Sequence, residues 1–191
     1  MSDYVIWKNV QRKNETCLRD FKGLDKTFPL LVGRSLKDTF PDNVTFSMDA
    51  DEPNRMLLTD SPTNTSLVVV GSERLAKFFQ DNNVPAVEYL PVAILNHKEK
   101  PIKEPYFILH PIDPIDCLNL QGVKVQYSKI LPDKINRLDR VVLFEDNIPP
   151  EIVYFRCKAL DLIIVVKRTF AEALSATGFT GFEWKELEEF R

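Results

Sequence analysis

His110, Asp113 and Asp116 are the residues whose types and spacing come nearest to a reactive site. A histidine nitrogen and two carboxylates can together ligate a divalent metal, and such nitrogen and oxygen donors suit zinc or manganese. Pro111 and Pro114 lie between them, however, and indicate an irregular loop, where aspartate is common for turn formation alone. We therefore expect a plain loop without a bound metal or cofactor. The alternative is a metal-dependent or small-substrate enzyme that uses this loop.

Other signatures of catalysis are missing from the sequence. It contains no glycine-rich phosphate-binding loop, no H-E-x-x-H zinc motif and no G-x-S-x-G nucleophile elbow. Cys17, Cys117 and Cys157 are odd in number and widely separated, which fits neither a disulfide framework nor a metal knuckle. We expect these cysteines to be buried, reduced thiols.

The charged residues disfavour one class of partner and suggest another. The net charge is −3, and the Lys and Arg residues are scattered without interleaved aromatic side chains, so we expect no binding to nucleic acid. Acidic residues gather instead near the C-terminus, and a second acidic pair lies upstream. We expect a basic protein partner to contact these acidic candidates: Glu183, Glu186, Glu188, Glu189, Glu145 and Asp146.

Two similar stretches, at about 67–89 and 162–184, are the elements around which the rest of the chain is arranged. Placing one over the other with an offset of 95 (164 minus 69) aligns apolar, helix-ending and aromatic positions. Each stretch reads as strand, helix, strand, and its opening apolar run lacks alternation, which predicts a strand covered on both faces. Duplication and convergence of two ordinary units both explain the match.

The helix of each unit should pack one stripe of side chains on a sheet, because apolar residues recur at i, i+3 and i+4. We expect near-complete burial of Leu75 and Phe79 in the first helix, and of Phe170 and Leu174 in the second.

The ends of these helices carry their own signals. Asn83 and Gly178 follow the two helices and tolerate a positive φ angle, which predicts a left-handed C-terminal cap at each. Ser72 is the expected N-cap of the first helix. Thr169 and Glu172 have the spacing of a capping box, which predicts a later start for the second helix.

The remainder of the chain is predicted to be rich in strands. The expected strands are 4–7, 30–32, 45–48, 87–95, 106–109, 115–120, 123–130, 141–144 and 152–157, with a brief helix at 35–40. The fold class is α+β, a mixed β-sheet with two short packed helices built around the two units. We expect a single domain over 1–191, in which 1–60 is an N-terminal strand and loop region and 60–191 contains the repeat.

The region from Asp60 to the C-terminus resembles the bacterial immunity-protein domain of polymorphic-toxin systems. The stretches that carry the resemblance are Leu67–Leu75, Ile115–Asn119, Tyr154–Arg156, Leu162–Val166, Ala171–Leu174 and Gly178–Phe182. These motifs mark structural positions rather than a reaction. The resemblance implies a small bacterial cytoplasmic protein that binds and blocks a cognate toxin.

We therefore predict a non-catalytic binding protein whose partner is a toxin and whose contact surface includes the acidic candidates. An assembly domain without a toxin partner stands as a second alternative beside the enzyme. The N-terminal residues show no basic region followed by an apolar core, and no apolar run approaches the length of a membrane span. We accordingly expect a cytoplasmic protein that does not enter the membrane.

Overall fold

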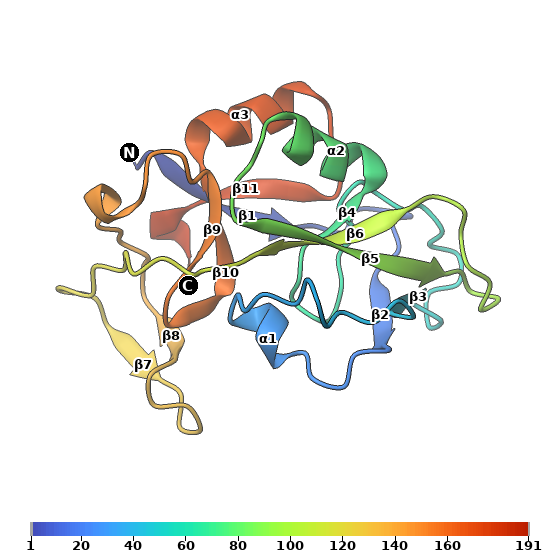
Figure 1. Ribbon diagram of the computed structural model, residues 1–191, viewed down its shortest axis with the longest axis horizontal. Coiled ribbons are helices and arrows are strands. Elements are labelled where there is room, and N and C mark those ends of the chain that lie inside the picture. Colours follow the sequence, from blue (N-terminus) through green and yellow to red (C-terminus); the bar gives the residue numbers. More distant parts are fainter. Residues whose placement is uncertain (1, 191) are drawn as a thin grey trace.

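A computed structural model of the protein describes residues 2–190 (Figure 1). Both predicted strand-helix-strand units are present, so the α+β prediction is confirmed. The first unit comprises β4 (Val70–Ser72), α2 (Glu73–Asp81) and β5 (Val87–Leu95), and the second comprises β10 (Leu160–Lys167), α3 (Arg168–Ala176) and β11 (Phe182–Glu186).

The other elements complete the sheets and connect the two units. They are β1 (Tyr4–Asn9), β2 (Leu18–Lys22), α1 (Phe28–Leu31), β3 (Thr45–Met48), β6 (Tyr106–Pro111), β7 (Val125–Tyr127), β8 (Ile135–Leu138), β9 (Tyr154–Cys157) and the short 3-10 helices η1 (Glu145–Asn147) and η2 (Leu187–Glu189). Within residues 2–190 the strands form a four-stranded sheet in the order β11-β1-β10-β9, a mixed five-stranded sheet in the order β2-β3-β5-β6-β4, and the β7-β8 pair.

Each unit is a split β-α-β arrangement, in which an antiparallel strand lies between the two strands of the unit. Strand β6 separates β4 from β5, and β1 separates β10 from β11. Because both outer strands run antiparallel to the inserted one, they are parallel to each other, and the helix makes the crossover. The inserted strand follows the unit in the first case and comes from the N-terminus in the second.

The strand register repeats as well as the topology. Equivalent residues 95 positions apart (165 minus 70) face equivalent positions on the inserted strands. The matched cross-strand pairs are Val70–Ile108 with Val165–Ile6, Tyr89–Leu109 with Trp184–Trp7, and Glu88–His110 with Glu183–Lys8.

The two longer helices lie side by side on the same face of the sheets and share one core (Figure 1). The ring of Phe170 in α3 lies 5.1 Å from that of Phe79 and 5.8 Å from that of Phe78, both in α2. Leu75, Phe79 and Leu174 are 0% exposed and Phe170 is 7% exposed. The predicted burial of these four side chains is confirmed.

Strand β10 is covered on both faces from Ile163 to Val166, as its apolar run predicts, whereas Leu162 at the start of that run is 48% exposed. Ile164 and Val166 belong to the core beneath α2 and α3. Ile163 and Val165 point the other way, into a second core that includes Ile135 of β8. A third core fills the space between the five-stranded sheet and the segment that contains α1.

The C-terminal caps of both helices agree with the prediction. Asn83 has a φ of 49° and Gly178 a φ of 70°. In the first unit the Val84 N–H donates to the carbonyl of Phe79 (3.0 Å) and the Asn83 N–H to that of Gln80 (2.9 Å), the two bonds of a Schellman motif.

Only one of the two predicted N-terminal caps forms. Ser72 Oγ accepts a bond from the Leu75 N–H (3.3 Å), as expected. The capping box at Thr169 is wrong, because α3 begins directly after β10, with Lys167 at the N-cap position and no side-chain cap. Tertiary contact replaces it, since the Arg168 N–H donates to the carbonyl of Asp3 (2.7 Å).

Four local predictions outside the units are wrong. The segment expected as a strand at 30–32 belongs largely to α1, where Pro29 in the first turn favours a helix start and Leu30 is fully buried. The helix expected at 35–40 is a turn closed by bonds from Thr39 and Phe40 to the carbonyl of Leu36. The strands expected at 115–120 and 141–144 are reduced to isolated bridges, at Ile115 and Leu118 in the first segment and at Leu143 in the second.

Among residues 2–190, none of the helices combines the length and the apolar composition that a membrane span requires.

Candidate functional site

The proposed metal ligands do not converge. His110 is 1% exposed at the end of β6, whereas Asp113 and Asp116 are exposed on the loop beyond it. The Asp113 N–H donates to Gly33 (3.1 Å), and the Asp116 carboxylate lies 3.5 Å from Lys158 Nζ. In the part of the chain that the structure describes, no group of three or more His, Cys, Asp or Glu side chains could hold a metal ion.

His110 has a structural environment instead of a reactive one. Its Nε2 lies 2.8 Å from the carbonyl oxygen of Arg34, which joins β6 to the segment after α1. Burial lowers the pKa of His110, and the nearby charge of Arg156 lowers it further. The lowered pKa favours the neutral imidazole at pH 7.

The cysteines are buried free thiols, as predicted. Cys117 and Cys157 lie close together, with 3.7 Å between their Sγ atoms, in the core beneath β9 and β10. Both are 0% exposed, so neither thiol is presented to a substrate in this conformation.

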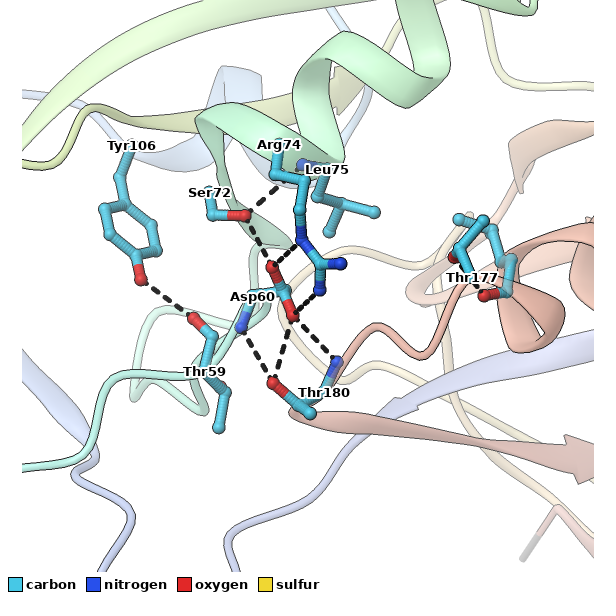
Figure 2. A network of polar contacts seen from close by, with 9 residues as sticks. Thr59, Asp60, Ser72, Arg74, Leu75, Tyr106, Thr177 and Thr180 are labelled. Atoms are coloured by element: carbon cyan, nitrogen blue, oxygen red, sulfur yellow. Dashed lines mark hydrogen bonds and ion pairs between the residues drawn. The ribbon is translucent and has the colours of Figure 1, made fainter.

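Asp60 is the centre of the most connected polar network, which sequence reasoning missed (Figure 2). Its carboxylate accepts hydrogen bonds from Ser72 Oγ (2.9 Å), from Nε and a terminal nitrogen of Arg74 (3.1 and 2.7 Å), and from the N–H and hydroxyl of Thr180 (3.0 and 3.1 Å). Ser72 and Arg74 belong to the first unit and Thr180 to the second. This Asp60 network therefore fastens the two units together.

The electrostatics of Asp60 suit a fixed anion rather than a proton carrier. Burial acts to raise its pKa, but the bonds from Arg74, Thr180 and Ser72 outweigh it and hold the pKa below the ordinary value. The side chain is 13% exposed. All its acceptor positions are engaged by the protein itself, so we assign it a structural role. The only sequence signal was its place in a turn-rich cluster.

The acidic candidates on β11 are paired with cations on two different faces. Lys8 Nζ lies 2.6 Å from Glu183. Glu186 accepts two hydrogen bonds from the guanidinium of Arg168 (3.0 and 2.8 Å) at the start of α3. The Arg168 bonds lower the pKa of Glu186. Side chains alternate between the two faces of a strand, so Glu183 and Glu186, which are three positions apart, point to opposite sides and do not form one patch.

The other acidic candidates are more open to solvent. Glu188 and Glu189 are exposed on η2, and neither forms an ion pair within residues 2–190. Asp146 is exposed on η1, and Glu145 accepts a hydrogen bond from Ser2 Oγ.

Ser2 also links the acidic candidate Glu145 on η1 to Glu186 on β11. Its carbonyl oxygen accepts bonds from Arg168 (3.0 and 2.9 Å), and Arg168 in turn binds Glu186. The structure thus brings Glu145 near Glu186 through Ser2 and Arg168, a proximity that their sequence separation of 41 (186 minus 145) does not reveal.

Comparison with known protein families gives a match over nearly the whole chain. Residues 5–189 match the family described as Immunity protein family (Imm11). The match extends over most of the first sixty residues, which the resemblance found in the sequence did not cover. No curated protein matches the chain.

Proposed function

The chain belongs to the Imm11 immunity protein family, which its residues 5–189 match, and we propose from this membership that it neutralises a cognate bacterial toxin by binding it. The family match is the observation that carries the proposal. Such a protein acts in the cytoplasm of the cell that must be protected, and its partner is the toxin rather than nucleic acid or membrane. Neutralisation results from occupation of the toxin and requires no catalytic step.

Stable occupation sets physical requirements on the complex. A specific, lasting interface buries about 1,200–2,000 Å² in total. Affinity within one interface is adjusted mainly through the dissociation rate, so an immunity protein must dissociate slowly. We propose a one-to-one complex of this kind.

The acidic candidates are the proposed electrostatic part of the contact. We propose that a basic partner contacts Glu188 and Glu189 on η2 and Glu145 and Asp146 on η1. Glu183 and Glu186 contribute less, because Lys8 and Arg168 already neutralise them. Complementary charge at a rim speeds encounter and selects the partner more than it adds net affinity.

Association kinetics with the toxin domain encoded by the neighbouring gene test this function. The wild-type protein should form a one-to-one complex. The double reversal Glu188→Lys/Glu189→Lys should slow association about tenfold at low salt and much less at high salt, because screening shortens the reach of charge. Glu186 is left unchanged so that its Arg168 pair stays intact.

The matched control reverses two exposed glutamates on the turn between β5 and β6, Glu99→Lys/Glu104→Lys. It changes the net charge by the same amount on a turn that carries none of the acidic candidates. Equal association rates for the two double variants would remove η2 from the interface. Failure of the wild-type protein to form any complex would overturn the proposed function itself.

A further inference from the structure

Strand β5 is paired with β6 along one edge, but its other edge has a neighbouring strand along only part of its length. Strand β6 pairs with it from Val87 to Val92. On the opposite edge, β3 pairs with β5 only at 93–95, in parallel. A turn at Asp42 and Asn43, just before β3, leads the chain away, so residues 87–91 have no strand beside them on that edge.

The direction of the backbone groups follows from bonds on either side. The Ala93 N–H donates to Val44 (3.0 Å), toward β3, whereas the carbonyl groups of Ala86 and Ile94 accept bonds from the chain on the β6 side, at Ile112 and Ile102 (both 2.9 Å). The direction of the main-chain N–H and C=O groups alternates from residue to residue along a strand. The N–H and C=O groups of the odd-numbered residues of β5 therefore point to the open edge.

The open edge therefore presents the N–H and C=O of Val87 and Tyr89 and the C=O of Pro91. Within residues 2–190 no hydrogen bond pairs these groups. Pro91 fits this assignment, since it lacks an N–H and stands where β6 needs no donor.

A groove of about 570 Å³ runs along this edge. Residues 86–91 form one wall, and Lys37, Phe40, Asp42 and Ile112 complete the lining. The charges of Lys37 and Asp42 offset each other. Glu88, also in the lining, is held by Ser35 Oγ and by the Leu36 N–H (2.9 Å). The groove thus combines apolar side chains such as Phe40 and Ile112 with an unpaired row of main-chain donors and acceptors.

Comparison with the equivalent strand supports a binding role for this edge. Charged side chains are a common protection of free edges against pairing with other chains. Strand β11 carries Glu183, Lys185 and Glu186 at the positions matching Glu88, Leu90 and Pro91, whereas residues 87–91 include a single charge, which is already engaged. The β5 edge lacks the charged side chains that its counterpart has.

We propose that the open edge of β5 docks an extended segment of the toxin, which adds a strand beside Val87–Pro91. The alternating partial charges of N–H and C=O along the edge complement the main chain of such a segment. The net formal charge of the groove is only −1, because Lys37 offsets Asp42 and Glu88 remains. A stretch of about five residues in extended form spans roughly 17 Å, the length of this edge. This inference rests on the proposed function, because it takes the toxin as the partner.

Amide hydrogen exchange, measured by NMR with and without the toxin domain encoded by the neighbouring gene, tests the docking site. The amides of Val87 and Tyr89 should exchange rapidly in the free protein and at least about tenfold more slowly in the complex. Those of Glu88 and Leu90, which face β6, should be protected in both states and serve as internal controls.

The possible outcomes separate the two proposals. A complex that leaves the exchange of Val87 and Tyr89 unchanged overturns the docking site and leaves the proposed function standing, whereas absence of a complex overturns both. Protection of these amides already in the free protein, with the mass of a dimer in light scattering, assigns the edge to a second copy of the chain and overturns the toxin assignment.

A pair of variants examines the same amide by another route. Tyr89→Pro removes the N–H that faces the groove without removing a bond to β6, and Tyr89→Ala removes the same side chain but keeps the N–H. We expect the complex to dissociate about tenfold faster with the proline variant than with the alanine variant. Equal dissociation rates for two folded variants would contradict the proposal, and amide exchange of the wild type decides the question if the proline variant unfolds.

Discussion

Replacement of Asp60 by alanine should weaken the fold, because the Asp60 network joins the two units through one carboxylate. The substitution leaves the Thr180 N–H and the Ser72 hydroxyl without their acceptor. A hydrogen bond to a charged group contributes about 1.5 kcal/mol at the lower end of its range. Arg74 is 57% exposed, so we assign its ion pair little weight. The expected loss in the free energy of unfolding is about 3 kcal/mol.

Thermal unfolding followed by circular dichroism measures this loss. For a protein of this length, about 3 kcal/mol corresponds to a decrease of roughly 6–12 °C in Tm. Asp133→Ala is the matched control, since Asp133 is exposed and forms no ion pair within residues 2–190. Its Tm should change by less than about 2 °C. A Tm for Asp60→Ala within the same margin would refute the structural role of the network.

The contribution of Asp60 should also depend on pH. Its pKa is lower in the folded protein than the ordinary value of 3.8. A depressed folded-state pKa gives stability that is present above the unfolded-state pKa and is lost as the pH falls through the folded-state pKa. The difference in stability between the wild type and Asp60→Ala should therefore be constant from pH 5 to pH 7 and shrink below about pH 4.

The remaining predictions concern the two helices and the His110 loop. Leu174→Ala and Phe79→Ala should each cost about 2–5 kcal/mol in the free energy of unfolding, because both side chains are fully buried, and chemical denaturation measures the loss. Gly178→Val should cost about 1–2 kcal/mol through its positive φ alone, since nothing lies within 4 Å of an added Cβ, whereas Asn83→Gly should be neutral or mildly stabilising in the same assay. Calorimetric titration with zinc or manganese should reveal no tight stoichiometric site that depends on His110.

Each of these predictions has a result that would count against it. Leu162 is 48% exposed on β10 and offers a control for the two core truncations, so an equal cost for Leu162→Ala would contradict the burial argument. A Gly178→Val protein as stable as the wild type would defeat the cap assignment. A zinc site lost in His110→Ala would promote the enzyme alternative.

The two units were predictable because their signals are local. The helical stripe around Phe79 and Leu174 and the continuous apolar run of β10 each lie within a few consecutive turns or residues, where periodicity reports directly on packing. The inserted strands were not predictable in this way. Tyr4 pairs with Lys167, which lies near the other end of the sequence, and no pattern within β1 specifies that partner.

The local errors arose where a short sequence signal was overridden by tertiary contacts. Leu30 and its neighbours form a run that serves a strand and a helix equally well, and the burial of Leu30 against the five-stranded sheet decides for the helix. The capping box at Thr169 failed because pairing of β10 with β1 continues to Lys167 and fixes where α3 begins.

The partners of charged residues in the candidate sites also depend on tertiary contacts that the sequence does not reveal. Sequence identifies Glu183 and Glu186 as an acidic cluster, but strand alternation and the register with β1 determine that Lys8 and Arg168 neutralise them from two faces. Asp60 finds Thr180 at a separation of 120 residues, so its role depends on how the two units pack together.

Titration of toxin activity against the amount of this protein tests the central claim most directly. Binding predicts that the activity falls linearly and reaches zero at one molar equivalent, with the two proteins eluting together in size-exclusion chromatography. Complete loss of toxin activity at a small fraction of an equivalent would require turnover and would contradict neutralisation by occupation. Full toxin activity in the presence of excess protein would contradict the immunity function altogether.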